Sequence, residues 1–290
     1  MNYKMPPVLQ LLRKETLRIS RDIKNIQMIR KLKLFEIIHN NLKIGIRKTK
    51  REIFYSAPKL FNKQYVTDKM VDQFLKEFNL KIEDLNILPS LKGLFYGPVY
   101  FEQEDGTIFE QNRDLIPDIS KIKNIKTIFN TILVIEKDSI LTFIKEMYFK
   151  KNKPLPFLLV TGKGYPDYNT THFLKKVTFS NENIKIYGLF DLDPHGLNIF
   201  KIYKKRIKNI KRIGITTTDV LKYKIKREEL LNLTKRDHQL LQTLSYTDKH
   251  DKQFYDDIDF LQGLSKKMEI ESLLNNDIDF ELFQYLERDI

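Results

Sequence analysis

The run of residues 184–196 constrains the fold more than any other part of this sequence. Its first half is mostly apolar and β-favouring, and Pro194 and Gly196 follow, so the pattern predicts a strand that leads into a helix. Asp191 and Asp193 stand two apart at this junction and would share one face if the strand extended that far. Paired carboxylates suit Mg²⁺, which prefers hard oxygen ligands. A solvated turn with an aspartate capping the helix is the alternative.

Strands and helices alternate from about Asn124 onward. Near-continuous apolar strands separated by helices predict a parallel α/β sheet, whose ligand-binding edge lies at the carboxyl ends of the strands. Glu136, the loop Gly162-Lys163-Gly164 and the aspartate pair all fall at that edge, which favours a metal site. Lys163 could contact a phosphate, although the loop lacks Walker A spacing. The expected strands are residues 131–135, 156–160, 184–190 and 212–215, and the expected helices are 139–149, one through Phe173, and 197–210.

The first eighty residues show helical periodicity. Residues 8–30 place apolar side chains at helical spacing opposite a basic face. This pattern predicts an amphipathic helix that docks on its own domain, on a partner protein or on an acidic surface. Residues 31–80 predict a compact helical unit with the outline of a helix-turn-helix. Its helices are expected near residues 34–38, 48–56 and 65–78.

Tyr55 stands within the second of these three helices. Arg51 precedes it by four residues and therefore shares its helical face. A phenol needs help to act as a nucleophile, because its pKa in water is about 10. An arginine can stabilise the phenolate or hold a phosphate with two hydrogen bonds. Tyr55 is one of 14 tyrosines, so ordinary packing of an amphipathic side chain is the alternative.

A junction between domains is expected at residues 91–123. Glycine and proline gather between Leu88 and Pro98, and residues 102–118 are polar, which is typical of loops. The part from residue 222 to the C-terminus is expected to be helical, with helices near 240–244 and 265–273. Core packing accounts for Phe280, Phe283 and Tyr285 in the acidic last stretch.

The charge balance narrows the class of partner. Lysine and arginine outnumber aspartate and glutamate by 51 to 38, a formal net charge of +13, which indicates a polyanionic partner unless a basic proteome explains it. The chain has no cysteine, which excludes disulfides and thiolate metal sites, and its five histidines lack zinc-like spacing. No signal peptide and no apolar run of transmembrane length is present, so we expect an intracellular protein without a membrane partner.

Taken in order, these motifs resemble the A subunit of topoisomerase VI and, more closely, the eukaryotic meiotic double-strand-break transesterase of that family. The resemblance runs from about Arg30 to the C-terminus, and the ordered set is specific although no single motif is decisive. Its motifs are Lys50-Arg51-Glu52-Ile53-Phe54-Tyr55 with Leu60-Phe61 and Gln64, Lys92-Gly93-Leu94, Val134-Ile135-Glu136-Lys137, Thr161-Gly162-Lys163-Gly164-Tyr165-Pro166-Asp167, Asp191-Leu192-Asp193-Pro194-His195-Gly196 and Leu233-Thr234-Lys235-Arg236-Asp237.

The resemblance implies an α+β and α/β architecture in which a winged-helix domain of the catabolite-activator type precedes a Toprim domain with a mainly parallel sheet. We place an amphipathic helix, with partner binding as one of its open roles, at 1–30. The winged-helix domain is placed at 31–90, the connecting region at 91–123, and the Toprim domain with its helical extension at 124–290. By motif match, Tyr55 is the nucleophile, Arg51 assists it, and Glu136, Asp191 and Asp193 hold Mg²⁺. The expected DNA contacts are Lys92, Lys137, Lys163 and His172.

Three positions depart from the usual pattern of the family. Phe54 stands where many relatives have a second tyrosine, His172 stands where relatives usually carry arginine, and His195 replaces a frequent tyrosine. The change at His172 is expected to weaken one DNA contact, and none of the three removes a matched catalytic group.

The resemblance predicts meiotic DNA double-strand breaks made by a Mg²⁺-dependent transesterase. It also implies a homodimer on double-stranded DNA, an ATPase-like B subunit or meiotic accessory proteins, and residence in the nucleus. Three alternatives stay open: a topoisomerase VI A subunit that works with an ATPase partner, a DNA-binding structural subunit that has lost cleavage, and a Toprim nuclease or primase-like enzyme. The last would have no use for Tyr55.

Overall fold

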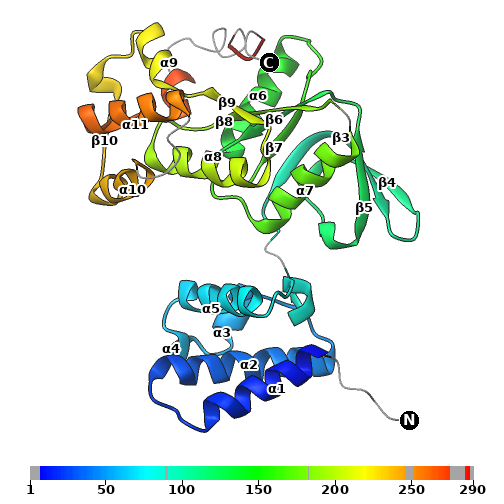
Figure 1. Cartoon of the computed structure of the whole chain (residues 1–290). Helices are drawn as coiled ribbons and strands as arrows, with labels where there is room; N and C mark the ends of the chain where they lie inside the picture. The colour runs from blue at the N-terminus through cyan, green and yellow to red at the C-terminus, as the bar shows by residue number, and fades with distance from the viewer. Residues whose placement is uncertain (1–6, 89–90, 182, 246–250, 275–284, 288–290) are drawn as a thin grey trace. The chain divides into compact units, whose positions relative to one another are not determined.

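The computed structural model describes residues 7–88, 91–181, 183–245, 251–274 and 285–287. By contacts the chain divides into two compact units, Met1–Ser90 and Leu91–Ile290, and each is described by itself (Figure 1). Within the described residues, no helix combines the length and apolar character needed to cross a membrane.

The N-terminal unit is a bundle of short helices around one core. A two-residue strand β1 (Lys48–Thr49) pairs in parallel with β2 (Ile87–Leu88), so the two ends of the segment 48–88 lie side by side. Buried Leu34, Phe35, Ile53 and Phe74 meet in the core, where the rings of Phe35 and Phe74 lie 4.8 Å apart. The helices are α1 (Pro7–Ser20), α2 (Ile26–Ile44), α3 (Lys50–Tyr55), α4 (Pro58–Phe61) and α5 (Gln64–Glu77), with a 3-10 turn at Ile82–Leu85.

The single amphipathic helix expected over residues 8–30 is wrong, because two helices occupy this region. Helix α1 ends at Ser20, and Asn25 begins α2 by accepting the amide of Met28 at 3.1 Å on its side chain. A side-chain cap of this kind fixes a new helix start and interrupts the periodicity. Leu12 and Ile19 of α1 are buried in the same core as α2, so this helix docks on its own unit.

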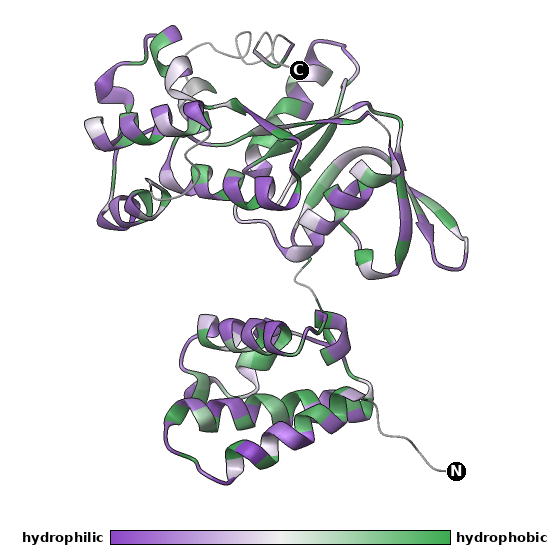
Figure 2. Cartoon of the chain, in the orientation of Figure 1, coloured by the Kyte–Doolittle hydropathy of each residue, from purple (hydrophilic) through white to green (hydrophobic). Residues whose placement is uncertain are grey.

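The second unit is built on a seven-stranded sheet. Six of its strands follow the order β4-β3-β7-β6-β8-β9, and the seventh, β5, pairs with β3. The four strands β7, β6, β8 and β9 are parallel, which confirms the mainly parallel α/β sheet. Figure 2 shows hydrophobic residues concentrated in these central strands. The strands are β3 (Leu94–Gln103), β4 (Ile108–Leu115), β5 (Ile122–Thr127), β6 (Thr131–Ile135), β7 (Leu158–Thr161), β8 (Lys185–Leu189) and β9 (Ile210–Gly214).

The helices of this unit connect the parallel strands. Helix α6 (Asp138–Lys150) links β6 to β7, α7 (Tyr168–Ser180) links β7 to β8, and α8 (Pro194–Arg206) links β8 to β9. A right-handed crossover on each connection puts α6 on one face of the sheet and α7 and α8 on the other. Contacts between α7 and α8 agree with this arrangement. Helix α9 (Thr217–Lys222) follows β9.

The region 91–123, expected to be a loop-like junction, instead supplies the antiparallel strands β3 and β4 and the start of β5 to the second unit. Buried and half-buried positions alternate along β3, where Phe95, Val99 and Phe101 enter the core. Strand β4 lies at an edge of the sheet and is mostly exposed. A solvated edge strand carries the polar composition of a loop, which is why this part of the prediction is wrong.

The C-terminal extension is mostly helical, as expected, with one departure. Only the last part of the helix expected at 265–273 is helical, because Ser265 takes a left-handed backbone with φ 51° and the short strand β11 (Lys266–Lys267) pairs with β10 (Leu231–Asn232). Tyr285 is buried, whereas Phe280 and Phe283 lie outside the described residues. The three helices are α10 (Lys235–Ser245), α11 (Lys252–Leu264) and α12 (Ile270–Leu274).

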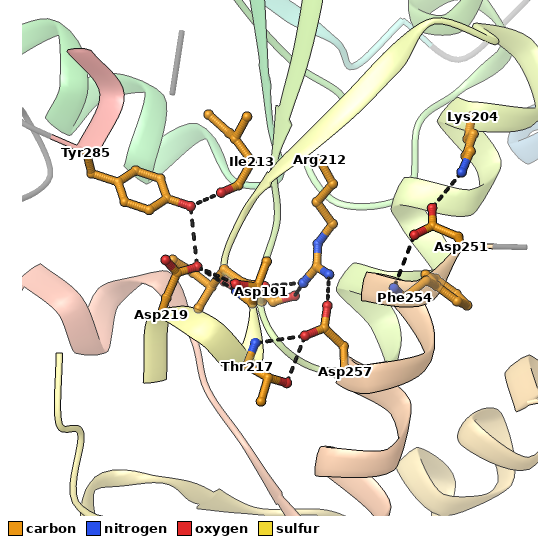
Figure 3. A network of polar contacts seen from close by, with 12 residues as sticks. Asp191, Lys204, Arg212, Ile213, Thr217, Asp219, Asp251, Phe254, Asp257 and Tyr285 are labelled. Atoms are coloured by element: carbon orange, nitrogen blue, oxygen red, sulfur yellow. Dashed lines mark hydrogen bonds and ion pairs between the residues drawn. The ribbon is translucent and has the colours of Figure 1, made fainter. Parts of the chain in front are cut away.

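A buried ion pair joins α11 to the sheet beside β9 (Figure 3). The guanidinium of Arg212 binds the carboxylate of Asp257, and the two side chains are 4% and 1% exposed. Asp257 also accepts the amide of Thr217 at 2.7 Å and its hydroxyl at 2.8 Å. Arg212 donates in addition to the carbonyl of Ile215. These contacts fix the C-terminal extension to strand β9 and to the residues that follow it.

We expect Asp257→Ala to lower the free energy of unfolding by about 3–5 kcal/mol, because it leaves the Arg212 charge buried without its partner. Urea denaturation followed by circular dichroism measures the loss. The matched control is Glu102→Ala, which breaks the half-exposed pair with Lys123 and should cost less than about 1 kcal/mol. Equal losses in both variants would contradict the anchoring role of the buried pair.

Candidate active site

The candidate acids lie at the point in the sheet where the strand order changes direction. The chain passes from β6 to β7 on one side and from β8 to β9 on the other, so the switch point lies between β6 and β8. Ligands of open α/β sheets bind beyond the carboxyl ends of the strands at such a point. Glu136 follows β6 and Asp191 follows β8, and these strands pair directly with Ile135 opposite Leu189. Topology thus joins two acids that lie 55 residues apart in the chain.

Glu136 and Asp191 are in direct contact and are buried, with 7% and 2% of their surface exposed. The amide of Asp191 donates to Oε2 of Glu136 at 3.0 Å. The carbonyl of Glu136 accepts the hydroxyl of Thr161 at 3.0 Å and the amide of Gly164 at 2.8 Å. These bonds hold the Gly162–Gly164 loop against the end of β6.

The first glycine of this loop is required by close packing. A Cβ atom at Gly162 would lie 2.6 Å from the hydroxyl of buried Tyr203. Lys163 then adopts a left-handed backbone with φ 51°. The loop therefore turns tightly over α8 and returns beside the acids.

Asp193 has a different local role. Strand β8 ends at Leu189, so Asp191 and Asp193 do not share a strand face, contrary to one expectation. Oδ1 of Asp193 instead accepts the amide of Gly196 at 2.6 Å as the N-cap of α8. The capping part of the alternative is confirmed, but the turn is not solvated, because both aspartates are buried. Across the described ranges, no group of three or more histidine, aspartate or glutamate side chains is arranged to hold a metal ion.

Burial and nearby negative charges raise the pKa values of the two contacting acids. Loss of solvent is the main cause at Glu136, whose pKa rises to about 8, and the charges of Asp191 and Asp193 add to the effect. Loss of solvent likewise raises the pKa of Asp191 to about 6, although the Ile270 amide and Lys137 oppose it. A cation placed between these oxygens would relieve the repulsion.

Lys137, one of the four expected DNA contacts, faces acids. Its Nζ lies 3.0 Å from Oδ2 of Asp191, 3.2 Å from Glu269 and 2.7 Å from Glu271. The ammonium therefore ties the end of β6 to the segment around α12. No sequence pattern indicated the contacts with the two glutamates, since these partners are more than 130 residues away.

The other three expected DNA contacts belong to loops and helices of the same unit. Nζ of Lys92 donates to the carbonyl of Lys163 at 3.4 Å, and Nζ of Lys163 lies 3.5 Å from Asp138. His172 is half-buried on α7, with its ring 5.4 Å from that of Tyr168. Their contact with DNA stays a prediction.

Tyr55 ends helix α3 of the N-terminal unit. A capping box begins this helix: the Glu52 amide donates to the Thr49 hydroxyl at 3.2 Å, and the Thr49 amide donates to the Glu52 carboxylate at 2.7 Å. Buried Ile53 anchors the helix, whereas Tyr55 is 58% exposed. The Arg51 guanidinium lies 5.7 Å from the centre of the Tyr55 ring, so the two share a face as expected. Within the described residues, the Tyr55 hydroxyl has no hydrogen-bond partner.

A second chain of polar contacts lies beside the acids, and no sequence pattern predicted it. The hydroxyl of Tyr165 lies 2.9 Å from Nδ1 of His195 and accepts from Asn198 at 3.1 Å. Nε2 of His195 lies 3.6 Å from Asp237, which binds Nζ of Lys267 at 3.1 Å. These contacts connect the Gly162–Gly164 loop region to the C-terminal extension. The family motifs contain Tyr165, His195 and Asp237 one by one. Their spacing in the sequence does not indicate that the three side chains contact one another.

Two family models match this chain. Residues 131–290 match the model of the Toprim domain of the topoisomerase 6 A subunit and Spo11, and residues 27–87 match "Type IIB DNA topoisomerase". The chain is 31% identical to the "Probable meiosis-specific protein SPO11 homolog" of Encephalitozoon cuniculi, over 96% of this chain and 95% of that protein. The chain belongs to the Spo11 and topoisomerase 6 A-subunit family.

More distant members of the family are longer than this chain. Identity is 28% to "Meiotic recombination protein rec12" of Schizosaccharomyces pombe, over 78% of this chain and 67% of that protein. Identity is 29% to the human "Meiotic recombination protein SPO11", over 73% of this chain and 58% of that protein. The family match confirms the resemblance and the Toprim domain, and the N-terminal helical unit is consistent with the winged-helix prediction.

The residues of this Spo11-family site fit a divalent cation in their chemistry. Oε1 of Glu136 and Oδ2 of Asp193 accept no hydrogen bond from the described part of the chain and are open to a ligand. Both oxygens of Asp191 are engaged, one by the Ile270 amide at 2.9 Å and the other by Lys137. Carboxylate oxygens are the ligands that Mg²⁺ accepts in proteins. The donor chemistry of Glu136 and Asp193 therefore fits such an ion, although in the described residues the three acids are not grouped as a metal site.

In the metal-free protein, the raised pKa of Glu136 is expected to make stability fall as pH rises. Between its ordinary value of 4.5 and about 8, this carboxyl keeps a proton in the folded state that the unfolded state has released, so rising pH favours unfolding. Glu136→Gln has no proton to lose. We expect it to exceed the wild type in stability by about 1–3 kcal/mol near pH 8 and to show a flatter pH dependence.

Urea unfolding in the presence of a chelator, at about pH 5.5 and about pH 8, measures both quantities. Near pH 5.5 the difference should be smaller than near pH 8, because this pH exceeds the unfolded-state pKa of 4.5 by only about one unit. A variant that is less stable than the wild type near pH 8 would show that ionised Glu136 is well accommodated without metal.

Proposed function

We propose that this chain makes DNA double-strand breaks that initiate meiotic recombination, by a topoisomerase-like transesterification. The observation that carries the proposal is the pairing of two features in one Spo11-family chain. An exposed tyrosine lies beside an arginine on α3, and buried acids stand at the switch point of a Toprim sheet. Neither a structural DNA-binding protein nor a Toprim nuclease requires both.

In the proposed reaction, Oη of Tyr55 attacks a DNA phosphorus. A bond forms between this oxygen and phosphorus, the bond from phosphorus to the 3′ oxygen breaks, and the phenol proton leaves the attacking group while the departing oxygen gains one. The product is a 5′-phosphotyrosyl link with a free 3′ hydroxyl, and no water is consumed. Arg51 stabilises the phenolate and the charge on the phosphate.

The acids supply the other half of the site. Glu136, Asp191 and Asp193 would hold Mg²⁺, and the chemistry that this ion would supply is the neutralisation of negative charge at the phosphate. The burial of these carboxylates supports this role, because their repulsion is relieved when a cation is bound. Lys92, Lys163 and His172 are proposed to contact the phosphates of the DNA backbone, with weak sequence preference and strong salt dependence.

A double-strand break needs two tyrosines, so the active form is proposed to be a homodimer on DNA. Tyr55 lies in the first unit and the acids lie in the second. We propose that the tyrosine of one protomer works with the acids of the other. An ATPase-like B subunit or meiotic accessory proteins are the proposed partners, and the nucleus is the proposed location.

The second candidate is a topoisomerase VI A subunit that passes strands with an ATPase partner. The match of residues 27–87 to the type IIB topoisomerase model supports it. Both candidates share the covalent step and differ in resealing. ATP-dependent relaxation of supercoiled DNA, in the presence of a copurifying partner, would favour this second candidate.

The covalent step is tested by capture of labelled DNA. The protein, with any ATPase-like partner that copurifies, is incubated with duplex DNA and Mg²⁺ and then denatured. We expect label on the wild type and none above background on Tyr55→Phe, which lacks only the nucleophilic oxygen. Tyr65→Phe is the matched control, since Tyr65 is 63% exposed in the same unit and should keep full labelling. Label on Tyr55→Phe would place the nucleophile elsewhere.

The shared active site is tested by mixing two inactive variants. Tyr55→Phe keeps its acids and Glu136→Gln keeps its tyrosine, so a mixed dimer regains one complete site only if the site is formed between protomers. We expect single-strand nicks and covalent capture on the Glu136→Gln protomer in the mixture, and none with either variant alone. Failure of the mixture to nick, when mixed dimers are verified by two tags, would place each site within one protomer.

A further inference from the structure

Lys137 has no part in the proposed catalytic scheme, and its ammonium lies among three acids. Its Nζ contacts Asp191, Glu269 and Glu271 at 3.0, 3.2 and 2.7 Å, and its side chain is 28% exposed. The residue follows Glu136 directly and precedes α6. Its backbone is therefore fixed at the end of β6, and its side chain reaches across to the segment beside α12.

The contact with Asp191 occupies an oxygen that a metal would need. Oδ1 of Asp191 accepts the Ile270 amide at 2.9 Å, and Oδ2 lies against the Lys137 ammonium. The ammonium is thus the counter-charge of the metal-free site. Glu269 and Glu271 offer it a second resting place, because they hold the same atom and are 40% and 39% exposed.

We propose that Lys137 is a displaceable internal cation, which neutralises Asp191 without metal and moves fully to Glu269 and Glu271 when a divalent ion binds. The inference rests on the proposed function, since the metal belongs to it. Lys137 then sets how tightly the site binds metal. The Lys137 ammonium is already neutralised by three carboxylates and would attract a DNA phosphate only weakly. The role as an internal cation therefore replaces the DNA contact expected from the sequence.

The fold allows this movement without losing the segment. Leu192 and Met268 exchange backbone hydrogen bonds of 2.9 Å in both directions, and the Ile270 amide bonds Asp191. These contacts hold residues 268–270 beside the acids independently of the ammonium. Removal of the Lys137 charge therefore alters the electrostatics of the site more than its framework.

The test compares Mg²⁺ binding by the full-length wild type and Lys137→Met, which keeps the length of the side chain and removes its charge. Isothermal titration calorimetry without DNA should show about tenfold or tighter binding by the variant, because a positive charge at contact distance no longer opposes the ion. Its melting temperature should be lower than that of the wild type in chelator and should rise more on addition of Mg²⁺.

Two controls separate the local charge from general effects. Lys137→Arg restores a positive charge and should return Mg²⁺ affinity toward the wild-type value. Lys123→Met removes a lysine from the surface pair with Glu102 and should leave Mg²⁺ affinity unchanged. A structural defect would weaken binding, so tighter binding is a result that misfolding cannot produce.

A double-mutant cycle tests the proposed resting place. The double substitution Glu269→Gln and Glu271→Gln should weaken Mg²⁺ binding in the wild-type background, because the displaced ammonium has nowhere to go. In the Lys137→Met background the same substitutions should have a much smaller effect, and the difference measures the coupling. Equal effects in both backgrounds would overturn the movement of the ammonium.

Unchanged or weaker Mg²⁺ binding by Lys137→Met would overturn the inference and leave the proposed function intact, since DNA capture by Tyr55 is measured separately. Absence of Mg²⁺ binding in both proteins would overturn the inference together with the metal role of the acids. If neither protein binds Mg²⁺, DNA capture that depends on Tyr55 and persists in chelator would show that the acids have no metal role.

Discussion

The repulsion between buried carboxylates at one strand edge is the constraint on which the C-terminal unit depends. The parallel pairing of β6 with β8 brings Glu136 against Asp191, and burial removes the water that would screen them. The surroundings supply one positive charge, Lys137, and two amide donors, those of Ile270 and Gly196. A bound divalent ion would complete this balance.

This requirement explains why the C-terminal extension packs against the acids of the second unit. Residues 266–274 donate to Asp191, pair with Leu192 and supply two acids to Lys137. The buried pair of Arg212 and Asp257 fixes α11 to the sheet behind them (Figure 3). The N-terminal unit has a simpler task, because a capped six-residue helix on a small core presents Tyr55 to solvent. In the proposed mechanism, assembly on DNA unites the two halves.

The sequence predicted the parallel strands well, because strands buried on both faces are apolar throughout and alternate with helices of ordinary length. Prediction from the sequence failed where the composition of a segment is not typical of the structure that it adopts in the fold. The polar strand at residues 108–115 has the composition of a loop because it lies at a sheet edge. The periodicity of residues 8–30 hid the cap at Asn25, and the left-handed turn at Ser265 interrupted an expected helix.

The sequence by itself determined the family, the pairing of Tyr55 with Arg51 on one helical face, and the placement of Glu136 and the aspartates at one sheet edge. These features follow from ordered motifs, from spacing within single elements and from the rule for parallel strands. Only the tertiary structure decided that Asp193 caps α8, that Lys137 is shared by acids more than 130 residues away, and that Tyr165, His195 and Asp237 form one chain of contacts. Contacts between distant segments depend on how the elements pack, and no local pattern encodes them.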